Sequence, residues 1–396
     1  MTTIGLVAGE SSGDLLGAGL IKAIRARRPD ARFVGVAGPA MAAAGCEVLA
    51  DSERLAVTGI AEVVEHLPGL LAFRRRLVRD FTDLKPDVFV GIDSPDFNLG
   101  LEARLKARGL RTIQYVSPSI WAWRAGRIKT IAKAVDRVLA LLPFEKDLYD
   151  ARGIDAVFVG HPLADEIAAV PDRAEARRRL KWPPDSNVLA LLPGSRRNEL
   201  DRLAPLFLET AERLTEQFPG LIIAAPMASP TLARHFDSLR EGRNYKLDLR
   251  LIEGHSREVM SAADAVLLAS GTAALEAMLL ARPMAVAYRL APMTRVIVQG
   301  LGLLKIEHVS LPNLLAGREI VPEFLQERAR ADLLTPAMAD LLDDPDTRAR
   351  QLEAFAPIAA TLARDASSRA AEAVLELVEG HASTFRGGGV ASSESL

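Results

Sequence analysis

Residues 266–284 read VLLASGTAALEAMLLARPM, and this stretch decides the fold class. It begins with four apolar residues, as a strand buried on both faces of a parallel sheet does. After a short polar break, strong helix formers fill residues 273–281, and an Arg-Pro pair ends the helix before a new apolar run starts at Met284. The stretch therefore predicts a strand, a turn, a helix and a second strand, which is the repeating unit of an α/β fold with parallel sheets.

The turn between this strand and helix consists of Ser270, Gly271 and Thr272. It leaves a helix N-terminus open, where free N–H groups and the helix dipole favour an anion. Glu276 follows one turn inside the helix, where its carboxylate could accept the two hydroxyls of a ribose. The pattern indicates half of a nucleotide site. The alternative is a turn that only caps the helix, with Glu276 as a solvated side chain.

A second strand-end loop supports the nucleotide interpretation. The apolar run 188–192 is followed by Gly194, Ser195 and Arg196. Glycine lets a backbone approach a ligand closely, and a guanidinium binds phosphate oxygens in bidentate fashion. The two loops could therefore converge on one pyrophosphate.

Composition limits the class of protein. A chain of 396 residues predicts two domains, and 49% hydrophobic with 25% charged residues is ordinary for a globular protein. A formal net charge of −2 gives no reason to expect nucleic acid as a partner. The single cysteine, Cys46, excludes an internal disulfide framework and fits a reducing compartment. Residues 1–8 resemble a first strand rather than a signal peptide, and no run of about 18 apolar residues occurs, so we expect a cytoplasmic protein.

Acidic residues follow two strands of the first half. Glu10 comes after the apolar run 4–8, in a loop that lacks a dinucleotide fingerprint, and Asp93 comes after the run 88–92. Ligands of open α/β sheets bind at the carboxyl ends of strands, so Asp93 is either a catalytic base or a structural turn residue. Asn98 suits the N-cap of a helix over residues 99–107.

Residues 57–80 combine apolar side chains with clustered arginines. Such a segment can lie in a membrane interface with its cations toward anionic headgroups. The alternative is an amphipathic helix packed on the sheet with solvated arginines. The candidate membrane contacts are Leu67, Leu70, Leu71, Phe73, Arg74 and Arg75.

One histidine, two tryptophans, a candidate linker and the C-terminal tail complete the sequence-based predictions. His161 is an acid/base group or a structural histidine, and the tryptophans at 121 and 123 form a cleft wall or pack their loop. The polar stretch 171–184 is the candidate linker, and residues 381–396 predict a disordered tail. Zinc-ligand spacing, a Walker A loop and an acidic metal cluster are missing from the sequence.

Several blocks together resemble one family. They are GESSGD at 9–14, GIDSPDFN at 91–98, YVSPSIWAW at 115–123, LLPGSR at 191–196, SGTAALE at 270–276 and SLPNLLAGR at 310–318. In this order and over this length, the chain resembles the lipid-A-disaccharide synthases. The resemblance implies a GT-B fold with two Rossmann-like domains facing across a cleft. The first would cover residues 1–168, joined by helices 350–380, and the second residues 172–345.

The resemblance also implies the reaction. A 2,3-diacylglucosamine moves from its UDP donor to 2,3-diacylglucosamine 1-phosphate (lipid X), with inversion, giving the β-1,6 disaccharide and UDP without a cofactor or metal. Asp93 would be the general base, Glu10 a second catalytic candidate, and Asn313 would join the UDP-site residues. Acylated substrates favour peripheral association with the inner membrane, and a homodimer is possible. The alternatives are another GT-B enzyme, such as a UDP-sugar 2-epimerase, or a non-catalytic membrane-binding module controlled by a nucleotide.

Overall fold

The computed structural model describes residues 1–55, 60–118, 125–243, 245, 247–290 and 308–386. The chain folds into two compact units. Unit 1 consists of residues 1–162 and the C-terminal segment from Leu362, and unit 2 of residues 163–361. Each unit has a parallel sheet covered by helices, so the predicted pair of Rossmann-like domains is confirmed. Among the described residues, no helix combines the length and apolar character needed to cross a membrane.

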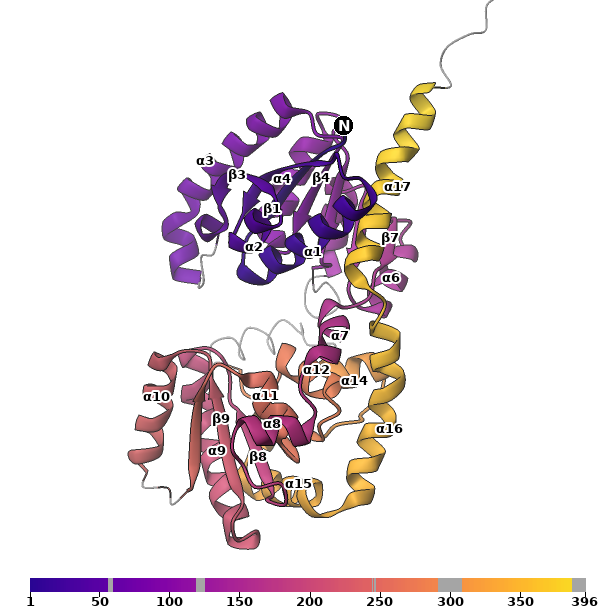
Figure 1. Cartoon of the computed structure of the whole chain (residues 1–396). Coiled ribbons are helices and arrows are strands. Elements are labelled where there is room, and N and C mark those ends of the chain that lie inside the picture. The colour runs from indigo at the N-terminus through magenta and orange to yellow at the C-terminus, as the bar shows by residue number, and fades with distance from the viewer. Residues whose placement is uncertain (56–59, 119–124, 244, 246, 291–307, 387–396) are drawn as a thin grey trace, which may run out of the picture. The chain divides into compact units, whose positions relative to one another are not determined.

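Unit 1 contains a seven-stranded sheet in the order β3-β2-β1-β4-β5-β6-β7 (Figure 1). Every strand pair is parallel, because each strand returns to the same edge through a helix or loop. The strands are β1 (Thr3–Ala8), β2 (Arg32–Ala37), β3 (Cys46–Asp51), β4 (Val88–Ile92), β5 (Thr112–Tyr115), β6 (Arg137–Ala140) and β7 (Ala156–Phe158).

The α-helices of unit 1 are α1 (Ser11–Arg27), α2 (Pro39–Ala43), α3 (Ile60–Leu84), α4 (Pro95–Lys106), α5 (Ile128–Ala134), α6 (Pro143–Asp150) and α17 (Ala366–Arg386). The C-terminal helix α17 completes the core beside α1, as Figure 1 shows. Its residues Ala370, Ala371 and Val374 are fully buried in the same apolar cluster as Leu20 and Ile21. Small side chains on α17 therefore allow the two helices to approach closely.

Unit 2 contains a six-stranded parallel sheet in the order β10-β9-β8-β11-β12-β13. Its strands are β8 (Val188–Leu192), β9 (Ile222–Met227), β10 (Leu249–Glu253), β11 (Ala265–Ala269), β12 (Met284–Tyr288) and β13 (Glu323–Leu325). Its α-helices are α8 (Arg173–Arg179), α9 (Arg197–Gln217), α10 (Pro230–Glu241), α11 (Ser256–Ala262), α12 (Thr272–Leu279), α14 (Leu311–Ala316), α15 (Ala331–Asp343) and α16 (Pro345–Leu362); α7 (Pro162–Glu166) begins at the boundary. The main apolar cluster lies where α9 and α15 cover the sheet.

The boundaries between the units differ from the expected ones. The polar stretch 171–184 is not a linker, because it contains α8, whose Arg177 is buried and ion-paired with Asp264 at 2.7 Å. Of the C-terminal helices, α17 belongs to unit 1, whereas α16 belongs almost entirely to unit 2. The expected disordered tail begins at 381, but α17 continues to Arg386, and residues 387–396 lie outside the described residues.

Candidate functional site

The chain reverses its direction across the sheet of unit 2 between β8 and β11. From β8 it proceeds outward to β9 and β10, and it then returns to place β11 on the other side of β8. Leu192 and Leu268 are partners in the β8–β11 pairing, so the loops that follow the two strands leave the sheet side by side. Such a switch point is where open α/β sheets bind ligands. The two predicted nucleotide loops therefore do meet at one place.

The loop after β8 has an acid at its centre. The Glu199 carboxylate accepts hydrogen bonds from the backbone N–H groups of Ser195 at 2.9 Å and Arg196 at 3.2 Å. Gly194 has φ +132°, and a Cβ there would lie 2.4 Å from Cβ of Glu199. The glycine thus lets the loop close over Glu199. A pyrophosphate could take the same N–H groups only if Glu199 moved aside, and the exposed Arg196 side chain carries the positive charge that would attract it.

The loop after β11 leads directly into α12. The Ser270 hydroxyl donates to the carbonyl of Val309 at 2.9 Å, and Thr272 is the first residue of the helix. Glu276 accepts a hydrogen bond from Nε of Arg257 at 3.0 Å, and the same guanidinium reaches Glu166 at 3.0 Å. Burial lowers the pKa of Arg257, but hydrogen bonds to both carboxylates outweigh it, and the pKa is raised. Arg257 therefore holds Glu276 in a fixed position beside the helix N-terminus.

Asn313 lies beneath this region with a fully buried side chain. Its amide nitrogen donates to the carbonyl of Val321 and to Glu323, at 2.9 and 2.8 Å, and its amide oxygen accepts from the backbone of Ile320 and Val321. Glu323 also accepts from the hydroxyl and the N–H of Ser310. The Asn313 amide is thus fully engaged within unit 2. Its position indicates support for the loop that contains Val309, the acceptor of the Ser270 hydroxyl.

Unit 1 has its own switch point between β1 and β4. Ala8 and Ile92 are partners in the pairing of these strands, so Glu10 and Asp93 follow neighbouring strand ends. Glu10 is exposed and half-buried Asp93 accepts a hydrogen bond from the Ser12 hydroxyl at 3.3 Å. The structure therefore brings both predicted acids to the same edge of the sheet.

The backbone at Asp93 is strained. Asp93 and Ser94 have φ of +53° and +41°, a left-handed conformation that side chains other than glycine rarely adopt. Two buried amides support it. Asn98 donates to the carbonyl of Asp93 at 2.9 Å and also reaches β1, and Gln114 donates to the same carbonyl at 3.1 Å. The expected N-cap role of Asn98 is wrong, because α4 begins at Pro95 and Ser94 precedes it, which places Asn98 one turn inside the helix.

A buried acid lies behind this turn. Glu102 on α4 is fully buried, and burial raises its pKa well above the ordinary value, which favours the protonated carboxyl. A Cβ on Gly91 would lie 2.2 Å from Oε1 of Glu102 and 3.0 Å from Cγ of Asn98, so the two side chains share the space that this glycine leaves. Among the described residues, no full hydrogen bond reaches the Glu102 oxygens or Oδ1 of Asn98, although the Gly91 N–H lies near the carboxyl.

Known proteins match this chain over nearly its whole length. A family profile described as lipid-A-disaccharide synthetase matches residues 4–377. The chain belongs to this family. The lipid-A-disaccharide synthase of Sodalis glossinidius is 53% identical over 376 residues, which cover 95% of this chain and 98% of that protein. The synthase of Pseudomonas aeruginosa is 50% identical over 376 residues, with the same shares covered.

Solved structures show how widely the fold of this synthetase family occurs. A putative UDP-N-acetylglucosamine 2-epimerase from Listeria monocytogenes superposes with a TM-score of 0.64 at 13% identity, covering 96% of this chain and 97% of that one. The UDP-GlcNAc 2-epimerase from Neisseria meningitidis, bound to UDP-GlcNAc, gives 0.63 at 12% identity, covering 96% of this chain and 100% of its own. At such identity the likeness shows the fold alone, which is of the GT-B type.

The predicted membrane contacts of this family member divide into two groups on α3. Leu67 is 44% exposed, Arg75 is exposed, and Leu70 and Leu71 are half-buried. Phe73 and Arg74 instead pack against α4: the two rings of Phe73 and Phe97 are 6.0 Å apart, and Arg74 lies 5.1 Å from the Phe97 ring. Phe73 and Arg74 thus attach α3 to α4, whereas the leucines and Arg75 keep surface that is open to solvent.

Sequence reasoning missed the groups that hold the site residues. Glu199 follows Arg196 by three residues, a spacing typical of a helix N-terminus, so a signal was present. No such signal pointed to Arg257, because its partners Glu276 and Glu166 are distant in sequence. None pointed to Glu102, because its neighbours are brought to it only by packing. Burial lowers the pKa of His161 to about 4, so this histidine is neutral at pH 7. The tryptophans at 121 and 123 lie outside the described residues.

Proposed function

We propose that this synthetase family member transfers 2,3-diacylglucosamine from its UDP donor to 2,3-diacylglucosamine 1-phosphate, with inversion, and releases UDP. The observation that carries the proposal is the match to the family over residues 4–377, in a chain whose predicted site residues gather at two switch points. The bound UDP-GlcNAc in a structural neighbour supports a UDP-sugar as the donor class.

Unit 2 would bind the UDP part of the donor. Gly194, Ser195 and Arg196 would meet the pyrophosphate, together with the N-terminus of α12 behind Ser270, Gly271 and Thr272. Glu276, fixed by Arg257, would accept the ribose hydroxyls. Helix dipoles, N–H donors and a guanidinium can stabilise a leaving diphosphate electrostatically.

Unit 1 would bind the acceptor and supply the base. Asp93 would accept the proton of the 6-hydroxyl as that oxygen attacks the anomeric carbon, while the bond to the diphosphate breaks and UDP takes the negative charge. The two amides that donate to the Asp93 carbonyl hold the backbone from which its side chain extends. Glu10, on the neighbouring strand end, would orient the acceptor or serve as the alternative base.

Acylated substrates must be collected from a lipid surface, and we propose peripheral association with the inner membrane through α3. Leu67, Leu70 and Leu71 would be the apolar contacts, because they keep exposed surface. Phe73 and Arg74 would stabilise the attachment of α3 to α4 instead. A homodimer stays a prediction.

The test combines the full-length protein with donor and acceptor in detergent micelles containing a chelator, and follows UDP and the lipid products. The expected result is UDP release only with both substrates, together with a disaccharide phosphate. Asp93→Asn should lower kcat by about 10²-fold or more while UDP binding by calorimetry is unchanged. The matched control is Asp96→Asn, which makes the same change three residues away. Equal losses in the two variants would refute the base assignment, and consumption of an unacylated UDP-sugar alone would refute the reaction.

A further inference from the structure

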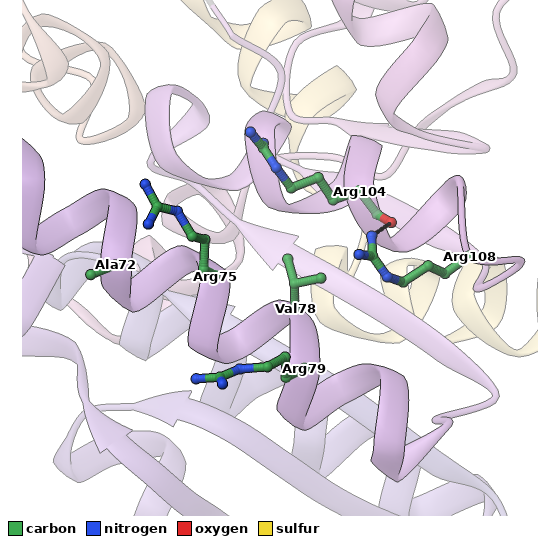
Figure 2. A pocket seen from close by; sticks show the side chains of 6 residues that line it. All are labelled: Ala72, Arg75, Val78, Arg79, Arg104 and Arg108. Carbon is green, nitrogen blue, oxygen red and sulfur yellow. Dashed lines mark hydrogen bonds between the residues drawn. The ribbon is translucent and has the colours of Figure 1, made fainter.

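A groove of about 530 Å³ lies between α3 and α4 in unit 1. Four exposed arginines line it with Ala72 and Val78, and Figure 2 shows Arg75 and Arg79 on one helix, with Arg104 and Arg108 at the end of its neighbour. We name it the arginine groove after these four residues. Each pair is spaced by four residues; Arg75 and Arg79 share one face of α3, whereas Arg104 is in the last turn of α4 and Arg108 in the turn that follows it.

Backbone carbonyls, but no described carboxylates, accept hydrogen bonds from the arginine groove: Arg108 donates to the carbonyl of Arg104 at 2.8 Å, and Arg104 donates to that of Gly100. Among the side chains that the structure describes, no carboxylate pairs with any of the four. Elsewhere the same spacing joins opposite charges, as in Arg76–Asp80 and Arg213–Glu209. Like charges at this spacing destabilise a helix. The effect reaches neighbouring Arg74, whose pKa is lowered by burial and also by the charge of Arg104.

A groove of unit 2 shows the contrast. It measures about 360 Å³ and also contains four arginines, but Asp201, Glu209 and Asp332 line it with them. Arg330 there forms an ion pair with Asp332 at 2.8 Å. The arginine groove differs from this groove in that no carboxylate is among the described residues that line it. The two pairs of like charges in the arginine groove are therefore open to an anion from outside the chain.

We infer that the arginine groove binds a phosphate group, and that the phosphate belongs to an anionic lipid headgroup. Guanidinium groups bind phosphate oxygens through paired, parallel N–H donors. The position on α3 indicates the lipid source, because Leu71 precedes Arg75 by one helical turn, about 6 Å along the axis. A lipid surface that touched the apolar turn would bring its phosphates to the arginines. The inference adds Arg104 of α4 and Arg108 of the turn after it to the proposed membrane association, on which it rests.

The test is flotation of the full-length protein with phosphatidylcholine vesicles, with and without phosphatidylglycerol. Arg104→Gln with Arg108→Gln leaves α3 intact, and each arginine near an anionic surface contributes roughly fivefold, so the pair should weaken binding to anionic vesicles about 30-fold. The matched control is Arg27→Gln with Arg152→Gln, which removes the same charge from exposed positions of unit 1, where neither arginine forms an ion pair with a described carboxylate. It should change binding less than threefold or so, because charges distant from the lipid surface are screened. Transfer activity in micelles should be unchanged in both double variants, which also shows that they fold.

Two further arms identify the ligand. Arg104→Lys with Arg108→Lys keeps the charge but loses the planar donors, so binding should fall below wild type; equal binding would mean diffuse attraction and overturn the groove. Glycerol 3-phosphate should not displace the vesicles; if it does, the site takes free phosphate and the lipid assignment is overturned. Wild-type protein that floats with neither vesicle refutes the membrane association and the groove together. If the wild type binds anionic vesicles and the Arg104→Gln, Arg108→Gln double variant binds them equally well, only the role of the arginine groove is refuted.

Discussion

A Glu102→Gln variant should become more stable than the wild type in unit 1, and this difference should grow as the pH rises. The buried carboxyl of Glu102 has a pKa raised well above its ordinary value of 4.5, so the folded protein holds a proton that the unfolded chain releases. Between 4.5 and the folded-state pKa, each pH unit therefore lowers the unfolding free energy by about 1.4 kcal/mol. Glutamine is neutral at every pH and has nearly the same shape, so the variant escapes this loss. Below pH 4.5 the contribution is fully present in the wild type.

Hydrogen exchange measures this without requiring the two units to unfold together. The slowest amides of β4 report the opening of unit 1, and comparing wild type with Glu102→Gln at the same pH cancels the intrinsic exchange rate. The ratio of protection factors should rise about tenfold per pH unit between 4.5 and the folded-state pKa. Glu372→Gln, an exposed change on α17, is the matched control and should give a flat ratio. A flat ratio for Glu102→Gln as well would show that the carboxyl is ionised in the folded protein, and the reasoning would be wrong.

Three further variants test other buried groups. Arg177→Met should destabilise unit 2 by about 3–5 kcal/mol in urea, because it leaves Asp264 without its buried partner, whereas Arg173→Met, on the exposed side of the same carboxylate, should cost about 1 kcal/mol or less. With a folded-state pKa of about 4, His161 binds its proton later than the unfolded chain, so wild-type stability should fall relative to His161→Gln as the pH drops from 6.5 toward 4, and parallel curves would contradict this. Gly91→Ala should cost about 1–3 kcal/mol by exchange of the β4 amides, since its Cβ would meet the Glu102 carboxyl; Gly126→Ala, with open space around it, should be close to neutral.

The fold was predictable because buried parallel strands are continuous apolar runs. Residues 188–192 and 88–92 match β8 and β4 in both bounds, and residues 266–269 lie within β11. The strand-end loops were predictable for the same reason, since a loop after a buried strand has a fixed address in the sheet. Which of these loops lie next to each other could not be predicted, because the order of the strands depends on which helix crosses which face of the sheet.

The supporting groups could not be predicted from local patterns. Glu102 lies in a helix between Leu101 and Ala103, with Arg104 two residues further on, and nothing in that spacing distinguishes a buried carboxyl from a solvated one. The left-handed turn at Asp93 and Ser94 moved the helix start to Pro95, which turned Asn98 inward. Glu276 could be placed beside the helix N-terminus, but its ion pair with Arg257 joins residues nineteen apart, with a strand and a loop between them.

Neutral groups support the turn at Asp93 from behind, and the charged groups lie at its open end. Strained left-handed residues persist only where neighbouring groups over-determine them, and here amide donors of Asn98 and Gln114 do so. Burial raises the pKa of Glu102 and so favours its neutral form, which adds no negative charge behind the turn. The O–H of that form is a donor beside the amide oxygen of Asn98, a buried acceptor that lacks one among the described residues. The negative charges of this switch point are thereby left to Glu10 and Asp93 at its open end. If Asp93 is the base, a glutamine at 102 should preserve turnover, since it keeps a neutral donor, whereas a leucine should lower kcat more than it raises KM by loosening the turn.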